Sequence, residues 1–477
     1  MNENPVALAP EALLLFGAVS ILLVGSFVPR RRQWVTRALT ALTLLAALGV
    51  SIAAAGDPGE VVYDGLWAVD GVTTAARLIV LPATLLTLGL AIPQVRGDKR
   101  ETEFSVLLML GALGALALAG ASDLMVLAVA YLLASLPLYA LAGFARDSSG
   151  TEAALKLYLL GAFLGIAMLL GVTLLYGVAG ATTYAELAER LPDAPRAPVA
   201  LGVVCLLAGL MFKVGGVPGH FWVPDVAQGA RTPAAAFTTT VPKVGGLVAA
   251  YRVLDAVPTT VVDWPLLVAI LAGLTMTLGN LAAFFQDSPR RLLGWSTVSQ
   301  AGYLLMAVAV AGRADLAMPS LLLYLAAYSV TNLGAFAVVA CLERRQTLAD
   351  YRGLARSRPA LAGALAICLL GLVGTPPTAV FVGKVVVFSA AWDGGLAWLV
   401  VLAAVNTVAS LFYYLRWLAP AFGTDAASTG TAARAPDEDR AGTWWAEFAA
   451  VTAGASVLGL GLFGGPALEL ATTPLLR

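Results

Sequence analysis

The amino-acid sequence predicts an all-α polytopic membrane protein, and three observations support this fold class. Of the 477 residues, 59% are hydrophobic and 12% are charged, whereas water-soluble domains carry about 25% charged residues. Apolar runs of about 20 residues recur along the whole chain, and each is long enough to cross the hydrocarbon core of a bilayer as a helix. The runs are continuously apolar and do not alternate, which favours helices over a β-barrel.

We expect about 14 transmembrane helices. In chain order they span residues 5–28, 35–55, 71–93, 104–120, 123–144, 152–178, 199–221, 232–255, 263–285, 291–311, 317–342, 360–391, 396–418 and 444–465. Two connecting stretches are longer than the others. Residues 179–198 would lie outside the cell, and residues 419–443, which are rich in Ala, Gly, Ser, Thr and charge, would form a mobile cytoplasmic loop without a site.

The distribution of basic residues predicts the orientation in the membrane. If the N-terminus lies outside, 19 of the 29 basic residues fall at cytoplasmic helix ends and loops. Five fall on the opposite side, namely Arg190, Arg196, Arg252, Arg313 and Arg477. This asymmetry agrees with the positive-inside rule. We also expect the first apolar run to remain as an anchor, because its basic residues follow it instead of preceding it.

The composition argues against several kinds of site. The net charge is zero, so there is no electrostatic basis for binding nucleic acid. Cys205, Cys341 and Cys368 occur singly in apolar segments, a pattern that argues against an iron–sulfur cluster, a zinc site or a disulfide framework. The sequence has no G-x-G-x-x-G motif and a single histidine. We therefore expect no cofactor and no metal in this chain, and any redox cofactor would lie on another subunit.

Two related motifs indicate an internal repeat. FKVGGVPG in the seventh predicted helix and GTPPTAVFVGK in the twelfth each combine an interior lysine with a Pro/Gly interruption. Broken helices at corresponding places in two five-helix units are typical of inverted repeats in transporters. We therefore divide the chain into an N-terminal three-helix segment (1–103), a first repeat (104–255), a second repeat (256–418), and a cytoplasmic loop with the last helix (419–477).

Three lysines, Lys213, Lys243 and Lys384, lie near the middle of predicted helices. An ammonium group at this depth costs at least about 2.5 kcal/mol, so it needs a partner, water or a function. Burial disfavours the charged form and a nearby charge changes that balance, which is what a reversible proton-holding site requires. The alternative is that each lysine reaches the membrane surface or makes a structural pair.

Four further polar residues have structural interpretations, and one of them, His220, also has a functional one. Lys156 follows Glu152 by four residues, so an ordinary helical ion pair explains it. His220 lies two turns after Lys213, and it could relay a proton or cap the broken helix as a neutral histidine. Asp225 is expected to cap the following half-helix. Asp70 is expected to cap the third helix, with Arg77 two turns inside it.

Several motifs resemble those of a known family. They are SLPLYAL (135–141), FKVGGVPGHFWVPDVAQGA (212–230), RRLLGWSTVSQAGYLL (290–305), LADYRGL (348–354) and GTPPTAVFVGK (374–384). With them, nearly the whole chain resembles the antiporter-like N subunits of bacterial respiratory NADH:quinone oxidoreductase, or complex I. The resemblance implies a proton-translocating subunit of the membrane arm, in the bacterial plasma membrane, driven by quinone reduction in neighbouring subunits.

The resemblance also implies roles for individual residues. Lys213, Lys243 and Lys384 occupy the positions of the family's seventh-, eighth- and twelfth-helix lysines, and Lys156 and His220 also match family positions. Together these five residues would form the proton path. The implied partners are other membrane-arm subunits, membrane lipid and, indirectly, quinone, while NADH, FMN and the iron–sulfur clusters would be bound by partner subunits.

Two positions depart from the family pattern. Leu132 stands where the fifth helix of the family usually carries a glutamate, and Gln300 stands where the tenth helix often carries a histidine. A glutamate beside a lysine stabilises its charged form, and separating the two releases the proton. Without that glutamate the switch is incomplete. Two alternatives therefore stay open: a subunit of a multisubunit cation/proton antiporter, and a non-pumping structural paralogue in a divergent complex I-like enzyme.

Overall fold

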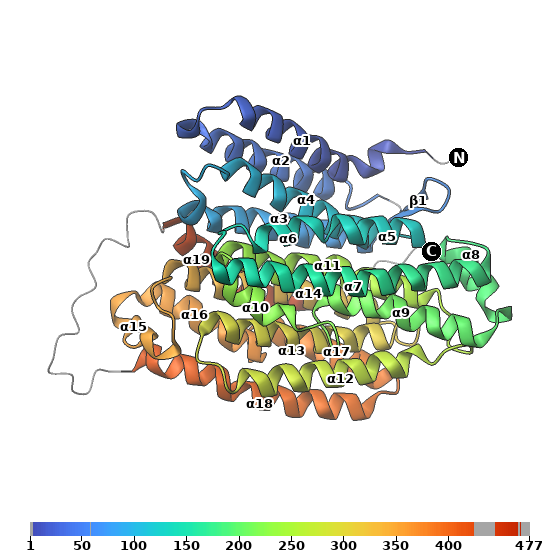
Figure 1. Ribbon diagram of the computed structural model, residues 1–477. Helices are drawn as coiled ribbons and strands as arrows, with labels where there is room; N and C mark the ends of the chain where they lie inside the picture. Colours follow the sequence, from blue (N-terminus) through green and yellow to red (C-terminus); the bar gives the residue numbers. More distant parts are fainter. Residues whose placement is uncertain (1–2, 58, 424–443, 466–467, 469–477) are drawn as a thin grey trace.

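The computed structural model describes residues 3–57, 59–423, 444–465 and 468. Within these residues the protein is a bundle of helices that run side by side, with one small hairpin (Figure 1). The predicted all-α membrane class is confirmed. Most of the stretch predicted as a mobile cytoplasmic loop, residues 424–443, lies outside the described residues, as does Arg477.

The first half of the described chain contains the hairpin strands and eleven α-helices. The strands β1 (Glu60–Val62) and β2 (Trp67–Val69) pair antiparallel. The helices are α1 (Ala9–Phe27), α2 (Trp34–Ala53), α3 (Gly71–Val95), α4 (Glu101–Gly120), α5 (Leu124–Leu133), α6 (Leu136–Ala142), α7 (Ser148–Ala179), α8 (Tyr184–Arg190), α9 (Arg196–Val214), α10 (Trp222–Gly229) and α11 (Thr232–Asp255).

The second half of the described chain is helical throughout. Its α-helices are α12 (Trp264–Ala283), α13 (Pro289–Ala309), α14 (Ala317–Cys341), α15 (Leu354–Ser357), α16 (Pro359–Val373), α17 (Ala379–Asp393), α18 (Ala397–Phe422) and α19 (Trp444–Leu462). Short 3₁₀ turns span Pro5–Leu8, Arg30–Arg32, Leu191–Asp193 and Leu348–Tyr351.

Twelve of the predicted spans correspond to segments that are long and apolar enough to cross a membrane, with α5 and α6 counted as one segment. The other two predicted spans are α11 and the pair α16 and α17. Helix α11 has 24 residues but includes a Thr-rich stretch and Lys243. Helix α16 has 15 residues and ends at a break before α17. Both exceptions lie at the positions where the sequence predicts polar or interrupted helices.

The bundle is built around three central helices, α11, α13 and α14. Nearly every residue of α11 is buried, and 94% of the apolar window of α13 and 89% of that of α14 are buried inside the protein. In the outer helices α1, α2, α7 and α18, only about a third of the residues in the corresponding apolar stretch are buried. Because the central helices do not face lipid, they can carry polar side chains at low cost.

Two helices break where the sequence predicts, and a third breaks where it does not. Helix α9 ends at Gly215 and α16 ends at Gly374, both in the left-handed conformation that glycine adopts readily. Helix α9 therefore stops at Val214 and does not continue to residue 221 as expected. The predicted fifth helix is also divided, into α5 and α6, at Ala134 and Ser135.

Two ion pairs are buried at the N-terminal end of α3. Asp70 accepts a hydrogen bond from the Thr73 backbone N–H, which confirms the predicted cap, and it also pairs with Arg252 at 2.6 Å. Arg77 pairs with Glu11 at 2.8 Å, and the two side chains are 1% and 7% exposed. The second pair therefore ties α1 to α3 without access to water.

We expect Arg77→Ala to lower the free energy of unfolding by about 3–5 kcal/mol, because it leaves the Glu11 carboxylate buried without its cation. Arg190→Ala is the matched control, since Arg190 pairs with Glu186 at the same 2.8 Å but both side chains are about half exposed. The control should cost less than about 1 kcal/mol. The midpoint of denaturation in mixed detergent micelles measures both, and equal midpoints would contradict the prediction.

Candidate functional site

Three lysine side chains are buried in the centre of the bundle. Lys213 in α9, Lys243 in α11 and Lys384 in α17 are 2%, 0% and 3% exposed. In the described part of the chain, none of the three contacts a carboxylate. Each instead contacts a backbone carbonyl close to the end of an interrupted helix. The breaks therefore provide the acceptors that a buried ammonium needs.

Lys213 lies at the break between α5 and α6. Its Nζ donates to Ser135 Oγ at 2.5 Å, and it lies 3.4 Å from the carbonyl oxygen of Tyr131. The Tyr131 ring lies beneath the same Nζ, at 4.4 Å from the ring centroid. The Ser135 backbone N–H turns away to Leu132, so the Tyr131 carbonyl is free to accept from side chains. Neutral groups thus surround Lys213 on this side.

Lys243 lies at the end of α9. Its Nζ donates to the carbonyl of Val214, the last residue of α9, and lies 3.3 Å from the carbonyl oxygen of Thr297 in α13. A cation is favoured at a helix C-terminus because the helix dipole places partial negative charge on its last carbonyls. Since Val214 directly follows Lys213, this contact brings the first two lysines to the same end of α9.

Lys384 has the equivalent place at the end of α16. Its Nζ donates to the carbonyl of Val373, the last residue of α16, at 2.8 Å and to Thr407 Oγ1 at 3.2 Å. The Tyr303 ring lies against the ammonium, 4.1 Å from its centroid. Both interrupted helices therefore end at a lysine ammonium. The lysine at the end of α16 comes from the same motif, whereas the lysine at the end of α9 is Lys243 of α11 and not the motif's own Lys213.

Gln300 connects the two broken regions. Its Nε2 donates to the carbonyl of Leu372, next to Val373, at 2.7 Å, and its Oε1 accepts from Tyr324 at 2.5 Å. One turn earlier in α13, the Thr297 carbonyl contacts Lys243. The polar row therefore runs from Lys213 through Lys243 and Gln300 to Lys384, with helix-end carbonyls between the side chains.

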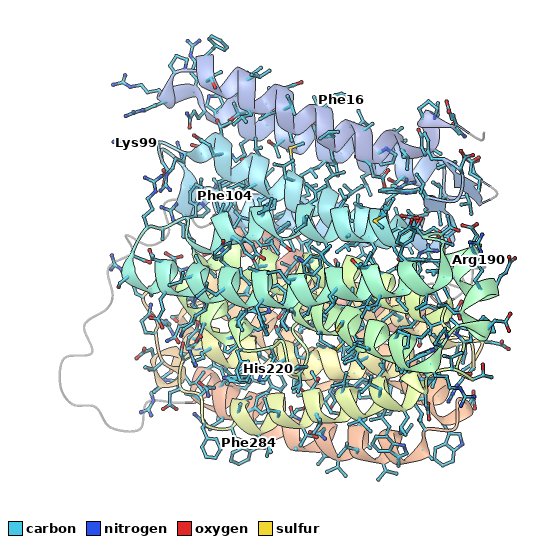
Figure 2. The ribbon with its side chains drawn as sticks, turned by 45° about the vertical axis from the view of Figure 1, so that its right-hand side comes forward. Phe16, Lys99, Phe104, Arg190, His220 and Phe284 are labelled. Carbon is cyan, nitrogen blue, oxygen red and sulfur yellow. The ribbon has the colours of Figure 1, made fainter. Side chains whose placement is uncertain are left out.

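His220 lies in the turn between α9 and α10, midway along the bundle between Lys99 at one end and Arg190 at the other (Figure 2). It is 2% exposed, and its Nδ1 has no hydrogen-bond partner in the described structure. The ring packs against Phe221 and Trp295. No described contact joins His220 to the three lysines.

Lys156 belongs to a separate ionic cluster at the rim of the bundle. It pairs with Glu152 at 2.7 Å, as the spacing predicts, and also with Asp225 at 2.9 Å. Asp225 also pairs with Arg291 of α13 at 2.8 Å. The expectation that Asp225 caps a half-helix is wrong: Phe221 is the N-cap of α10, and Asp225 lies in its first turn, where its side chain reaches two cations.

Leu132 faces away from the buried lysines. Its side chain is 48% exposed, whereas the neighbouring Tyr131 is 2% exposed and contacts Lys213. The carboxylate that the family pattern places at position 132 is therefore replaced around Lys213 by an aromatic ring, a hydroxyl and a carbonyl. Sequence reasoning missed Tyr131 and Ser135, and the SLPL motif that follows the break was the only signal for them.

The described residues contain no group of three or more His, Cys, Asp or Glu side chains that could hold a metal ion. Cys205, Cys341 and Cys368 are all unpaired thiols. The side chains of the buried row are lysine, hydroxyl and amide groups, which can exchange protons and hydrogen bonds.

We expect Gly219→Ala to lower the free energy of unfolding by about 1–3 kcal/mol. A Cβ at this position would lie 2.6 Å from the backbone of Phe212, so the turn that carries His220 would have to move away from α9. Gly177→Ala is the control, because nothing lies within 4 Å of its Cβ and alanine favours a helix by up to about 1 kcal/mol. The denaturation midpoint should fall in Gly219→Ala and rise slightly in Gly177→Ala. A shift of both midpoints in the same direction would contradict this account of the packing.

Comparisons with known proteins agree with this architecture. The family described as NADH:quinone oxidoreductase/Mrp antiporter, TM, matches residues 121–410. The chain is 55% identical to NADH-quinone oxidoreductase subunit N 1 of Streptomyces griseus and 51% identical to subunit N of a Mycobacterium species, each over 98% of both chains.

Solved structures show the same fold. A chain of respiratory complex I from Thermus thermophilus with bound aureothin is 34% identical, with a TM-score of 0.82, over 98% of this chain and 100% of that one. A chain of the Mrp complex from a Dietzia species has a TM-score of 0.84 at 22% identity, over 98% and 96% of the two chains. The second likeness concerns the fold alone.

Proposed function

The chain belongs to the NADH:quinone oxidoreductase/Mrp antiporter transmembrane family, which confirms the resemblance found in its motifs, and from this we propose its function. It is the N subunit in the membrane arm of a proton-translocating NADH:quinone oxidoreductase. Its relatives at 55% and 51% identity carry that name. The structural observation that supports the proposal is the row of three buried lysines, each at the end of an interrupted helix.

In this function the buried row carries protons between lysines. A lysine held by carbonyl and hydroxyl oxygens keeps its charge only while those acceptors stay close, because burial otherwise favours the neutral amine. Moving the end of α9 or α16 by a small distance would therefore change whether Lys243 or Lys384 holds a proton. Quinone reduction in partner subunits would supply that movement, and NADH, FMN and iron–sulfur clusters would be bound there.

The proposed site consists of the five predicted residues, to which the structure adds Gln300 and Asp225. Lys213, Lys243 and Lys384, with Gln300 between them, form the buried row. Lys156 and Asp225 form the rim cluster. His220 belongs to neither group. It lies in the turn between α9 and α10, near the start of α10. The N-terminus faces the outside of the bacterial membrane in this proposal, which places Lys99 and Arg231 on the cytoplasmic side.

We expect Lys213→Ala and Lys384→Ala to lower the ratio of protons translocated to quinone reduced by at least about two-fold. Quinone reduction should fall less, because in this proposal the redox groups are bound by partner subunits. Lys99→Ala, a change to an exposed loop lysine, is the control and should leave the ratio unchanged. The measurement uses NADH-driven acidification of inverted membrane vesicles.

An unchanged ratio in both variants would favour a non-pumping structural subunit. Sodium-dependent proton exchange by the same vesicles without an electron donor would instead favour a cation/proton antiporter. Measurements on the same vesicles therefore distinguish the proposal from both alternatives.

We expect Leu132→Glu to leave the proton ratio unchanged, because the side chain at this position faces outward. Ser135→Asp should lower the ratio, since it places a carboxylate where Ser135 Oγ now lies 2.5 Å from Lys213 Nζ, and a fixed carboxylate stabilises the charged lysine throughout the cycle. Ser135→Asn is the uncharged control of similar size. A higher ratio in Leu132→Glu would show that α5 can turn position 132 toward Lys213.

A further inference from the structure

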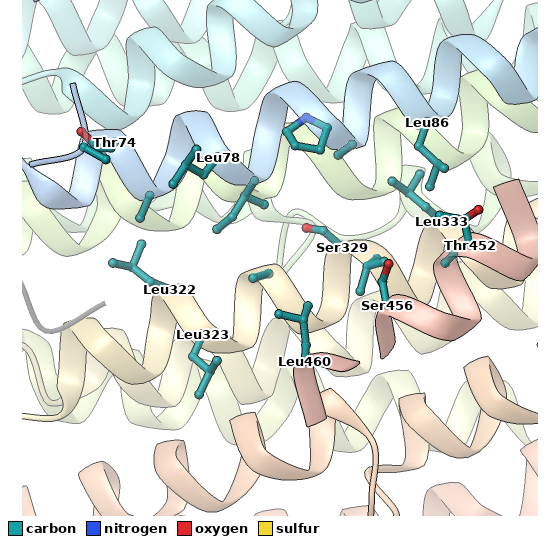
Figure 3. A pocket seen from close by; sticks show the side chains of 18 of the residues that line it. Thr74, Leu78, Leu86, Leu322, Leu323, Ser329, Leu333, Thr452, Ser456 and Leu460 are labelled. Carbon is teal, nitrogen blue, oxygen red and sulfur yellow. The ribbon is translucent and has the colours of Figure 1, made fainter. Parts of the chain in front are cut away.

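A narrow apolar cavity opens between α3, α14 and α19 (Figure 3). Its volume is about 500 Å³, and none of its lining residues is charged. Leu78 and Leu86 come from α3, Leu323 and Leu333 from α14, and Leu460 from α19. These helices belong to three different parts of the chain, the N-terminal segment, the second repeat and the last helix.

The cavity runs along the helices and opens sideways. It extends from Thr74, near the start of α3, to Leu86, near its middle, and the lining of α14 likewise begins near the start of that helix and ends near its middle. With Gly71 included, the cavity runs along α3 from Gly71 to Leu86, which is about 22 Å at the rise of an α-helix. Leu78, in its wall, is 38% exposed. The cavity therefore extends over about 22 Å of a hydrocarbon core about 30 Å thick, past its middle, and it is open to the lipid at the side.

The dimensions decide what fits the cavity. Spread over about 22 Å, 500 Å³ corresponds to a mean cross-section of roughly 20 Å². An α-helix is at least about 10 Å wide and has a cross-section of about 80 Å², so no helix of a partner subunit can enter. One extended hydrocarbon chain is the shape that such a slot accepts. The hydrocarbon core that surrounds these helices is made of such chains.

The side-chain polar groups that line the cavity are four hydroxyls: Thr74 lies at the end where α3 begins, and Ser329, Ser456 and Thr452 lie farther along the cavity (Figure 3). Ser329 is 3% exposed, and its Oγ has no hydrogen-bond partner in the described structure. Helical serines can turn their hydroxyl to a carbonyl of the preceding turn, so this group does not require a polar ligand. A charged headgroup has no counter-ion at this depth and would have to stay at the membrane surface, near Thr74.

We propose that the cavity between α3, α14 and α19 binds one acyl chain of a phospholipid, with the headgroup at the membrane surface where α3 and α14 begin. The bound chain fills the space between the N-terminal segment, the second repeat and the last helix. It thereby adds to the direct packing of α14 against α19 and α3 and of α19 against α3.

The test uses the intact complex in nanodiscs that contain a phosphatidylcholine with a photoreactive diazirine on its acyl chain. After illumination, mass spectrometry locates the labelled peptides. We expect labelling of the α3, α14 and α19 peptides at several times the level of the lipid-facing α18. Ala326→Phe and Leu78→Trp, two substitutions from different walls, should each reduce the labelling of these peptides several-fold.

Two controls identify the occupant. Val408→Phe adds the same ring to an exposed position of α18 and should leave the labelling of the cavity unchanged. Ser329→Ala should also leave it unchanged, because a hydrocarbon chain makes no use of the hydroxyl, whereas a ligand with a polar group at this depth, such as a quinone head, would be lost. Labelling no higher than that of α18, labelling that persists in both filled variants, or loss of labelling in Ser329→Ala would overturn the proposal.

Discussion

The contact between a buried ammonium group and the carbonyl end of an interrupted helix is the interaction on which the centre of this protein depends. Lys213, Lys243 and Lys384 are buried without a carboxylate partner in the described structure, and an isolated ammonium cannot stay at this depth. The breaks after α5, α9 and α16 each leave a carbonyl without its usual helical partner. Lysines and breaks therefore need each other, and neither would be stable alone.

The position of these contacts explains why the most polar helices are the most buried. Helices α11, α13 and α14 carry Thr, Ser, Asn, Gln and Tyr side chains, which hydrogen-bond to one another and to backbone groups. The outer helices carry the apolar surface that meets lipid. This inverts the arrangement of a water-soluble protein, because here the solvent is hydrocarbon and the interior is the place where polar groups find partners.

Much of this arrangement could be predicted from sequence, and the failures have physical reasons. Long apolar runs identify helices well, so the spans and both Pro/Gly breaks were predicted. The break at Ser135 was missed because the only proline, Pro137, lies in the first turn of α6, where proline is tolerated. Tyr131 and Ser135 could not be identified as partners of Lys213, since 78 residues or more separate them in sequence, and a pattern within one helix carries no information about such contacts.

The carboxylate of Asp225 is shared between Lys156 of α7 and Arg291 of α13. Helix α10, which carries it, follows the turn after α9 and packs between α7 and α13, so the two ion pairs join it to both neighbours. One acid therefore serves three helices, α7, α10 and α13. Replacing Asp225 by an uncharged residue would leave both Lys156 and Arg291 without this partner at once, whereas replacing either cation would leave the other pair in place.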